Sequence, residues 1–187
     1  GNEPIDYFGT SMGGIIGMIL ASAPNTPIKR LILNDIGPVL KLEALQRIEK
    51  GLHNNQSRFK SLEEARPILK ERYKTFGIAS EEEWDFFIGV ALKKDGDEWI
   101  MHYDPNINKA FVVPQADVPL WNLWDAIKCP VLLLRGKNSD LIDSATVEEM
   151  KTRGPKDFTV VEFDGVGHAP TIYSEEQIKP VTDWLAL

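Results

Sequence analysis

Short apolar runs alternate with amphipathic stretches along much of the chain. Two of the runs, Leu-Ile-Leu within residues 31–34 and Val-Leu-Leu-Leu within residues 131–135, are continuously apolar. Continuous runs of this kind are typical of parallel strands that are covered on both faces. The alternation of strands and helices predicts an α/β fold, with a mostly parallel sheet and flanking helices. The predicted strands span residues 5–8, 31–34, 131–135 and 158–163, and the predicted helices span residues 13–22, 144–151 and 175–185.

Residues 38–126 break this alternation, because most of their patterns are helical and have charged faces. The strands of the predicted sheet all lie outside this segment, within residues 1–37 and 127–187. We therefore expect a core built from those two parts and a mostly helical insertion between them. Within the insertion, the expected helices span residues 40–52, 62–76, 81–93 and 119–127, and residues 98–103 form either a brief strand or a loop.

The first predicted strand leads directly into Gly-Thr-Ser-Met-Gly at residues 9–13 and then into an apolar helix. A serine with a glycine two residues away on each side, at a strand-to-helix junction, is the nucleophile-elbow pattern of serine hydrolases. The turn is sharp and strained, and it lifts the serine hydroxyl clear of the sheet. We expect side chains at Gly9 and Gly13 to collide where strand and helix meet, and Gly14 to keep the helix close to the sheet. Ser11 is the predicted nucleophile, and the alternative is an ordinary serine in a glycine-rich turn.

Two later strands also precede residues that are suited to catalysis. Asp140 lies in the loop after residues 131–135, and His168 lies in a glycine-flanked loop after residues 158–163. Polar residues at the carboxyl ends of parallel strands are well placed to share one site. The chain order serine, aspartate, histidine is that of the α/β-hydrolase triad. Asp140 is the preferred acid, although it also suits a turn or a helix cap. Asp35 and Asp143 are the competing acids.

These segments together resemble the α/β-hydrolase fold family, and in particular its capped, esterase-like members with a serine nucleophile. The resemblance covers essentially the whole chain but only the later part of the family's core. It implies that residues 38–126 form a helical cap. The matching segments are Gly-Thr-Ser-Met-Gly-Gly at residues 9–14, Leu-Asn-Asp-Ile-Gly-Pro at 33–38, Leu-Arg-Gly-Lys-Asn-Ser-Asp at 134–140 and Gly-Val-Gly-His-Ala-Pro at 165–170.

The resemblance also implies a role for each site residue. Ser11 would attack the substrate carbonyl, His168 would move its proton to the leaving group, and Asp140 would orient the imidazole. The backbone N–H of Met12 would supply one donor of the oxyanion hole. The family's second donor comes from an earlier loop, and its first strands precede the elbow. We therefore expect the chain to be the C-terminal part of a longer hydrolase. Its elbow strand would then lie at an exposed sheet edge, open to self-association or to the missing N-terminal segment.

These patterns favour a serine-dependent hydrolase that acts on a small, partly apolar carbonyl substrate through an acyl-enzyme on Ser11. A carboxylic ester is the preferred substrate. The same triad also serves carbon–carbon bond, lactone and thioester hydrolysis, and an inactive truncated fragment or an interaction module remains a further alternative. Aromatic residues of the insertion either wall an apolar pocket above Ser11 or form the insertion's own core.

Composition mainly excludes other classes of protein. The 187 residues carry a formal net charge of −7, which argues against binding to nucleic acid or to an anionic membrane. Cys129 is the single cysteine, and the three histidines lack metal-ligand spacing, so we expect no internal disulfide, no metal and no cofactor. No apolar stretch is long enough to span a membrane, and no signal-like segment is seen, so a cytoplasmic location is expected.

Overall fold

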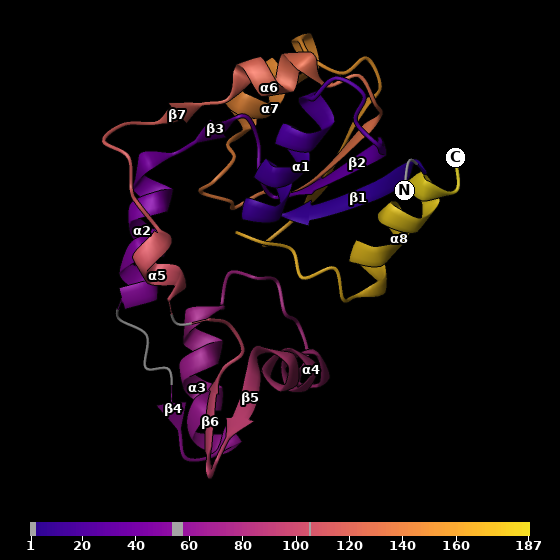
Figure 1. The fold of residues 1–187 in the computed structure, drawn as a ribbon. Coiled ribbons are helices and arrows are strands. Elements are labelled where there is room, and N and C mark those ends of the chain that lie inside the picture. The colour runs from indigo at the N-terminus through magenta and orange to yellow at the C-terminus, as the bar shows by residue number, and fades with distance from the viewer. Residues whose placement is uncertain (1–2, 54–57, 105) are drawn as a thin grey trace.

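A computed structural model describes residues 3–53, 58–104 and 106–187, and its centre is a four-stranded parallel sheet (Figure 1). Each strand pairs in parallel with its neighbour, and the spatial order is β1-β2-β8-β9. The predicted α/β class with a mostly parallel sheet is therefore confirmed. The four strands are β1 (Ile5–Thr10), β2 (Ile28–Asn34), β8 (Val131–Gly136) and β9 (Phe158–Phe163).

Helices cover both faces of this sheet, which explains why its central strands are continuously apolar. Leu31 and Leu33 of β2 pack into a core with α1, α6 and α7, whereas Ile32 between them packs into a second core with α8. Successive side chains of a strand point to opposite faces, so both faces of β2 need apolar residues. The four helices are α1 (Met12–Ser22), α6 (Trp121–Ala126), α7 (Ser144–Thr152) and α8 (Glu175–Leu185).

Residues 38–126 contribute several short elements that Figure 1 shows largely to one side of the main sheet. Helices α3 and α4 pack with a three-stranded antiparallel sheet around a core of their own, which includes Phe59, Leu69 and Ile88. For residues 98–103 the sequence left a brief strand and a loop open, and the structure has the strand β6. The helix expected at 81–93 is shorter, because its last residues form β5. The elements are β3 (Val39–Leu40), α2 (Leu42–His53), β4 (Arg58–Phe59), α3 (Leu62–Arg72), α4 (Glu81–Ala91), β5 (Leu92–Asp95), β6 (Glu98–Met101), α5 (Ile107–Ala110) and β7 (Val118–Pro119).

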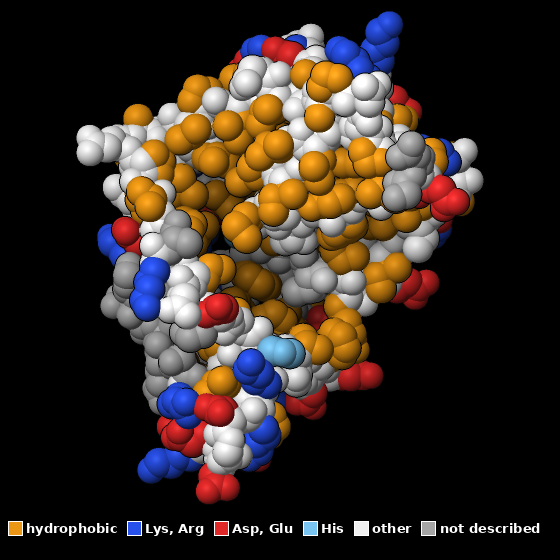
Figure 2. Space-filling model, in the orientation of Figure 1, with side chains coloured by type: hydrophobic (Ala, Val, Ile, Leu, Met, Phe, Trp, Pro, Cys, Tyr) orange, Lys and Arg blue, Asp and Glu red, His pale blue; other side chains and the backbone are white. Residues whose placement is uncertain are grey.

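The elbow strand β1 lies at the edge of the main sheet, as expected. Several large apolar side chains of β1 and α1 are exposed there, and Figure 2 shows hydrophobic side chains gathered over this part of the molecule. Among the described residues, no helix combines the length and the apolar character needed to cross a membrane. The exposed apolar residues of β1 and α1 are Ile5, Phe8, Met12, Ile16, Ile19 and Leu20.

The glycines of the elbow allow α1 to pack closely against the sheet. A Cβ atom at Gly9 would lie 2.4 Å from the carbonyl oxygen of Gly13, and one at Gly14 would lie 2.3 Å from Cγ2 of Ile36. The collision expected at Gly13 itself is wrong, because a Cβ atom there has no atom within 4 Å. Position 13 lies on the first turn of α1 and faces open space. The backbone there, namely the carbonyl group of Gly13 and the nitrogen of Gly14, is what limits Gly9.

This difference predicts unequal effects of two alanine substitutions. Gly9→Ala should lower the free energy of unfolding by roughly 1–3 kcal/mol, because the methyl group meets backbone atoms that cannot move aside. Gly13→Ala should raise it by up to about 1 kcal/mol, because alanine is the better helix former and meets no neighbour. Urea unfolding of the two variants measures both changes. Equal losses would contradict the packing described for the elbow.

Candidate active site

Ser11 occupies the sharp turn between β1 and α1. Its backbone has φ 52° and ψ −118°, in a region that residues with a side chain rarely adopt. The carbonyl oxygen of Ser11 accepts hydrogen bonds from the N–H groups of Gly14 and Ile15, at 2.9 and 3.2 Å. The helix therefore begins directly after Ser11, and the strained turn presents the hydroxyl at the carboxyl end of β1.

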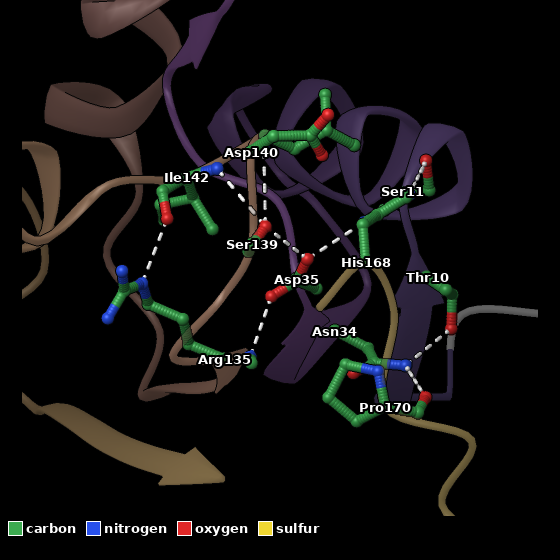
Figure 3. A network of polar contacts seen from close by, with 12 residues as sticks. Thr10, Ser11, Asn34, Asp35, Arg135, Ser139, Asp140, Ile142, His168 and Pro170 are labelled. Atoms are coloured by element: carbon green, nitrogen blue, oxygen red, sulfur yellow. Dashed lines mark hydrogen bonds and ion pairs between the residues drawn. The ribbon is translucent and has the colours of Figure 1, made fainter. Parts of the chain in front are cut away.

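Three side chains that are far apart in the sequence form a continuous chain of polar contacts at this point (Figure 3). The Nε2 atom of His168 lies 3.0 Å from Oγ of Ser11, and its Nδ1 atom lies 2.8 Å from Oδ2 of Asp35. The side chain of Asp35 is fully buried, and that of His168 is 12% exposed. A carboxylate at Nδ1 favours the tautomer whose Nε2 can accept the serine proton. Ser11, His168 and Asp35 thus have the geometry of a nucleophile, a base and an orienting acid.

Asp140 does not take part in this arrangement, so the prediction that it contacts His168 is wrong. Its carboxylate instead binds the guanidinium group of Arg47 on α2, with one hydrogen bond of 2.8 Å, and its side chain is 43% exposed. The loop after β8 turns tightly, because the N–H group of Ser139 donates to the carbonyl oxygen of Gly136 at 2.9 Å. This turn directs the side chain of Ser139 inward, and Asp140 emerges on the outer side. Asp35, one of the two competing acids, takes the position beside His168.

Asp143, the other competing acid, is instead the N-cap residue of α7. Its carboxylate accepts a hydrogen bond of 2.7 Å from the backbone N–H group of Thr146, as an N-cap residue does. Hydrogen bonds from the side chain and backbone of Thr146, together with Lys41, lower the pKa of Asp143 to about 2. These contacts assign Asp143 to the helix cap.

The buried carboxylate of Asp35 accepts hydrogen bonds from groups other than His168. The backbone N–H group of Gly136 donates to Oδ1 at 2.8 Å, and the hydroxyl of Ser139 donates to Oδ2 at 2.5 Å. These donors matter because a buried charge is costly unless it is hydrogen-bonded. Sequence reasoning missed Ser139. The available signal was its place in the same loop as Asp140, one residue earlier.

The loop that carries His168 is fixed from two sides. The side-chain amide of Asn34 donates to the carbonyl oxygen of Pro170 at 2.9 Å and to the hydroxyl of Thr10 at 3.1 Å. From the insertion, the carbonyl oxygen of Thr75 accepts a hydrogen bond of 2.6 Å from the N–H group of Gly167. The imidazole is therefore held between the sheet and the insertion.

Two apolar cavities meet at Ser11. The first, here called the His168 chamber, has a volume of about 480 Å³ and is bordered by Ser11 and His168. The second, the Met12 chamber, has a volume of about 430 Å³ and is bordered by Ser11 and Met12. Apolar residues of the insertion line both of them: Phe76, Phe86, Phe87 and Val90 in the first, and Leu45, Ile48, Phe111 and Val118 in the second.

The aromatic residues of the insertion thus serve both of the purposes that the sequence left open. Phe86 is 52% exposed, stacks on Tyr173 and lines the His168 chamber. Trp84 is buried instead, and packs edge-to-face on Phe87. Among the side chains that the structure describes, no group of three or more histidine, cysteine, aspartate or glutamate residues is placed to hold a metal ion.

The parallel sheet, the serine at a strand-to-helix turn, and the histidine and aspartate beyond later strand ends define an α/β-hydrolase fold. Structural comparison supports this assignment. A presumed hydrolase from Rickettsia typhi superposes with a TM-score of 0.89 and 36% identity over 98% of this chain. An α/β-hydrolase from Novosphingobium aromaticivorans superposes with a TM-score of 0.86 and 28% identity, also over 98% of this chain. The matched regions make up 62% and 66% of those two proteins.

Sequence comparison finds a hydrolase that is similar to this chain. The chain is 41% identical over 186 residues to the 3-hydroxybutyrate-oligomer hydrolase of Cupriavidus necator, and the match covers 94% of this chain. The chain spans 63% of the length of that hydrolase. No protein-family model matches the chain. The chain therefore has the α/β-hydrolase fold in partial form, and it is similar in sequence to a hydrolase.

Proposed function

We propose that the protein is a serine-dependent hydrolase that cleaves carboxylic esters through an acyl-enzyme on Ser11. The observation that carries this proposal is the contact chain from Ser11 through His168 to the buried Asp35, at the junction of two apolar chambers. His168 accepts the proton of Ser11 as the hydroxyl attacks the ester carbonyl, and returns it to the leaving alcohol. Water then attacks the acyl-enzyme by the same route.

The backbone N–H group of Met12 is the proposed donor to the oxyanion. It belongs to the first residue of α1, where N–H groups have no acceptor within the helix. The helix dipole also favours negative charge at this end. A donor placed in this way stabilises the tetrahedral intermediate more than the substrate, which is what lowers the barrier.

The chambers support a substrate whose groups next to the ester bond are uncharged and partly apolar. Among the described residues that line them, neither chamber contains a lysine or an arginine, and Glu83 is the one carboxylate. The relative from Cupriavidus necator acts on oligomers of 3-hydroxybutyrate. An internal ester of such an oligomer has a short carbon chain on each side, so we propose a short oligoester as the natural type of substrate. We also propose that residues 38–126 act as the cap that closes over it.

The chemistry assigns each half of the ester to a chamber. The leaving oxygen has to lie within reach of His168, whereas the carbonyl oxygen points to the N–H group of Met12. We therefore infer that the alcohol half occupies the His168 chamber and the acyl half occupies the Met12 chamber. Val90 borders the first chamber from α4, and Ile48 borders the second from α2.

Filling each chamber separately tests this assignment. Ile48→Phe should lower kcat/KM about tenfold for long acyl chains and little for long alcohols, because one lost or blocked methylene group changes binding by about 1–3 kcal/mol. Val90→Phe should do the reverse. Two ester series, one varying the acyl chain and one varying the alcohol, give the kcat/KM values. The opposite pattern would reverse the assignment without affecting the proposed hydrolase activity.

A substrate panel tests the proposed bond class directly. We expect hydrolysis of p-nitrophenyl butyrate and of the 3-hydroxybutyrate trimer, with thioesters, lactones and vinylogous diketones cleaved more slowly. Cleavage of the diketones without cleavage of esters would replace the ester proposal by carbon–carbon bond hydrolysis. If no compound were cleaved, the result would favour the alternative of an inactive fragment.

Self-association at the β1 edge and a cytoplasmic location stay predictions.

A further inference from the structure

One polar residue beside the proposed triad has no role in the steps described above. The hydroxyl of Ser139 lies 2.5 Å from Oδ2 of Asp35, and this is the same oxygen that Nδ1 of His168 contacts at 2.8 Å. Ser139 therefore touches neither the nucleophile nor either chamber, but it shares one carboxylate oxygen with the catalytic base. Figure 3 shows the hydroxyl on the side of Asp35 away from Ser11.

The surroundings of Ser139 fix the direction in which its hydroxyl donates. Its Oγ atom accepts from the backbone N–H groups of Leu141 and Ile142, at 3.2 and 3.4 Å. Those N–H groups can only donate, and an ionised carboxylate can only accept. The hydroxyl proton is therefore directed to Asp35. A separation of 2.5 Å is typical of an O–H group that donates to a charged oxygen.

The loop that carries Ser139 is itself firmly placed. The N–H group of Lys137 donates to the carbonyl oxygen of Phe163 at 3.0 Å, and that of Asn138 donates to Val166 at 2.8 Å. At the other end of the loop, Leu141 and Ile142 are buried in the core. The same loop begins at Gly136, whose N–H group binds Oδ1 of Asp35. One rigid loop thus holds both oxygens of the carboxylate.

We propose that Ser139 is a positioning residue, which holds the carboxylate of Asp35 so that Oδ2 faces Nδ1 of His168. This proposal rests on the proposed role of Asp35. The neutral hydroxyl is suited to the task, because a second carboxylate so close to Asp35 would repel it. The loop after β8 therefore contributes a donor to the acid, although the sequence suggested that it contributes the acid itself.

The role has two measurable consequences. Without the Ser139 hydroxyl, the carboxylate is free to rotate, and misplaced groups of this kind cost up to about 100-fold in rate. The carboxylate also loses a donor that shares its negative charge. Among the described residues, His168 is the titratable side chain in contact with this carboxylate, so its protonated form is stabilised more strongly. Glu83 borders the same chamber as His168, and the substitution leaves it unchanged. Because His168 acts as a base only when neutral, the acidic limb of the kcat/KM profile moves to higher pH.

The experiment compares Ser139→Ala and Ser139→Cys with the wild-type protein. The cysteine variant keeps nearly the same shape but offers only a weak donor, so it remains informative if the alanine variant folds poorly. Rates are expressed per active site, counted with a fluorophosphonate, so that loss of folded protein is not mistaken for loss of rate. The matched control is Ser144→Ala, because Ser144 begins α7 a few residues further on and is exposed.

We expect both Ser139 variants to lose about 10- to 100-fold in kcat per site, with KM within about twofold and a pH midpoint above that of the wild type. Ser144→Ala should match the wild type in all three. In a double variant, Ser139→Ala should add little to the loss of kcat that Asp35→Asn causes, because both substitutions act through the carboxylate of Asp35. If kcat per active site and the midpoint of the acidic limb of the kcat/KM profile both stayed at their wild-type values, Ser139 would be a structural turn residue without the proposed positioning role. If Asp35→Asn itself retained full activity, the assignment of the acid would fail instead.

Discussion

Asp35→Asn is expected to lower kcat for ester hydrolysis by about 10⁴-fold, the loss seen when the orienting aspartate of a serine protease becomes asparagine. An amide at this position turns its N–H₂ group or its oxygen toward Nδ1 of His168. When the N–H₂ group faces the ring, Nε2 carries the proton and cannot accept another from Ser11. The substitution preserves volume, so the site stays packed while its proton transfer fails.

Asp140→Asn is the matched control for this experiment. Asp140 follows β8 much as Asp35 follows β2, but its carboxylate binds Arg47 in an exposed ion pair. Such pairs contribute about 0–1 kcal/mol, so kcat should stay close to the wild-type value and the thermal midpoint should fall only slightly. Steady-state kinetics with p-nitrophenyl butyrate measure both variants. A large loss in Asp140→Asn with normal activity in Asp35→Asn would return the role of the acid to Asp140.

Ser11→Ala is expected to have the largest effect, a loss of about 10⁶-fold in kcat by analogy with the serine of subtilisin-type triads. In the proposed mechanism the Oγ atom forms the covalent intermediate, so no other part of the site can replace it. KM should change little, because the chambers and the Met12 N–H group remain. Ser22→Ala, at the other end of α1, is the control and should keep full activity. Substantial residual hydrolysis by Ser11→Ala would place the nucleophile elsewhere.

The strands of the main sheet could be predicted because burial on both faces requires continuous apolar runs, as in β2 and β8. The small strands β4 and β5 could not be predicted, and for β6 the sequence left a strand and a loop open. They are short, and their pairing joins distant segments, as when Phe59 pairs with Trp99. The collision predicted at Gly13 was wrong because it also depends on contacts between distant segments. The motif does not say which face of the first helical turn meets the sheet.

The presence of Ser11 and His168 in one site could be predicted from local motifs, whereas the aspartate that contacts His168 could not. Asp35 and Asp140 both lie beyond the carboxyl end of an apolar strand, and the sequence alone gives no lateral order for those strands. In the structure, β2 lies next to β1 and β8 lies one strand further away. Asp35 is thus nearer to Ser11, and the turn at residues 136–139 directs Ser139 inward and leaves Asp140 outside. Which aspartate contacts His168 therefore depends on the order of the strands in the sheet and on the turn after β8.

Fluorophosphonate labelling followed by peptide mass spectrometry tests whether His168 and Asp35 activate Ser11 as the nucleophile that we propose. The adduct should form on the peptide that contains Ser11, at equal rates in the wild-type protein and Asp140→Asn, far more slowly in Asp35→Asn, and not at all in Ser11→Ala. An adduct on another serine would contradict the proposed role of Ser11. A Ser11 adduct that forms at a rate dependent on Asp140 and not on Asp35 would contradict the proposed role of Asp35.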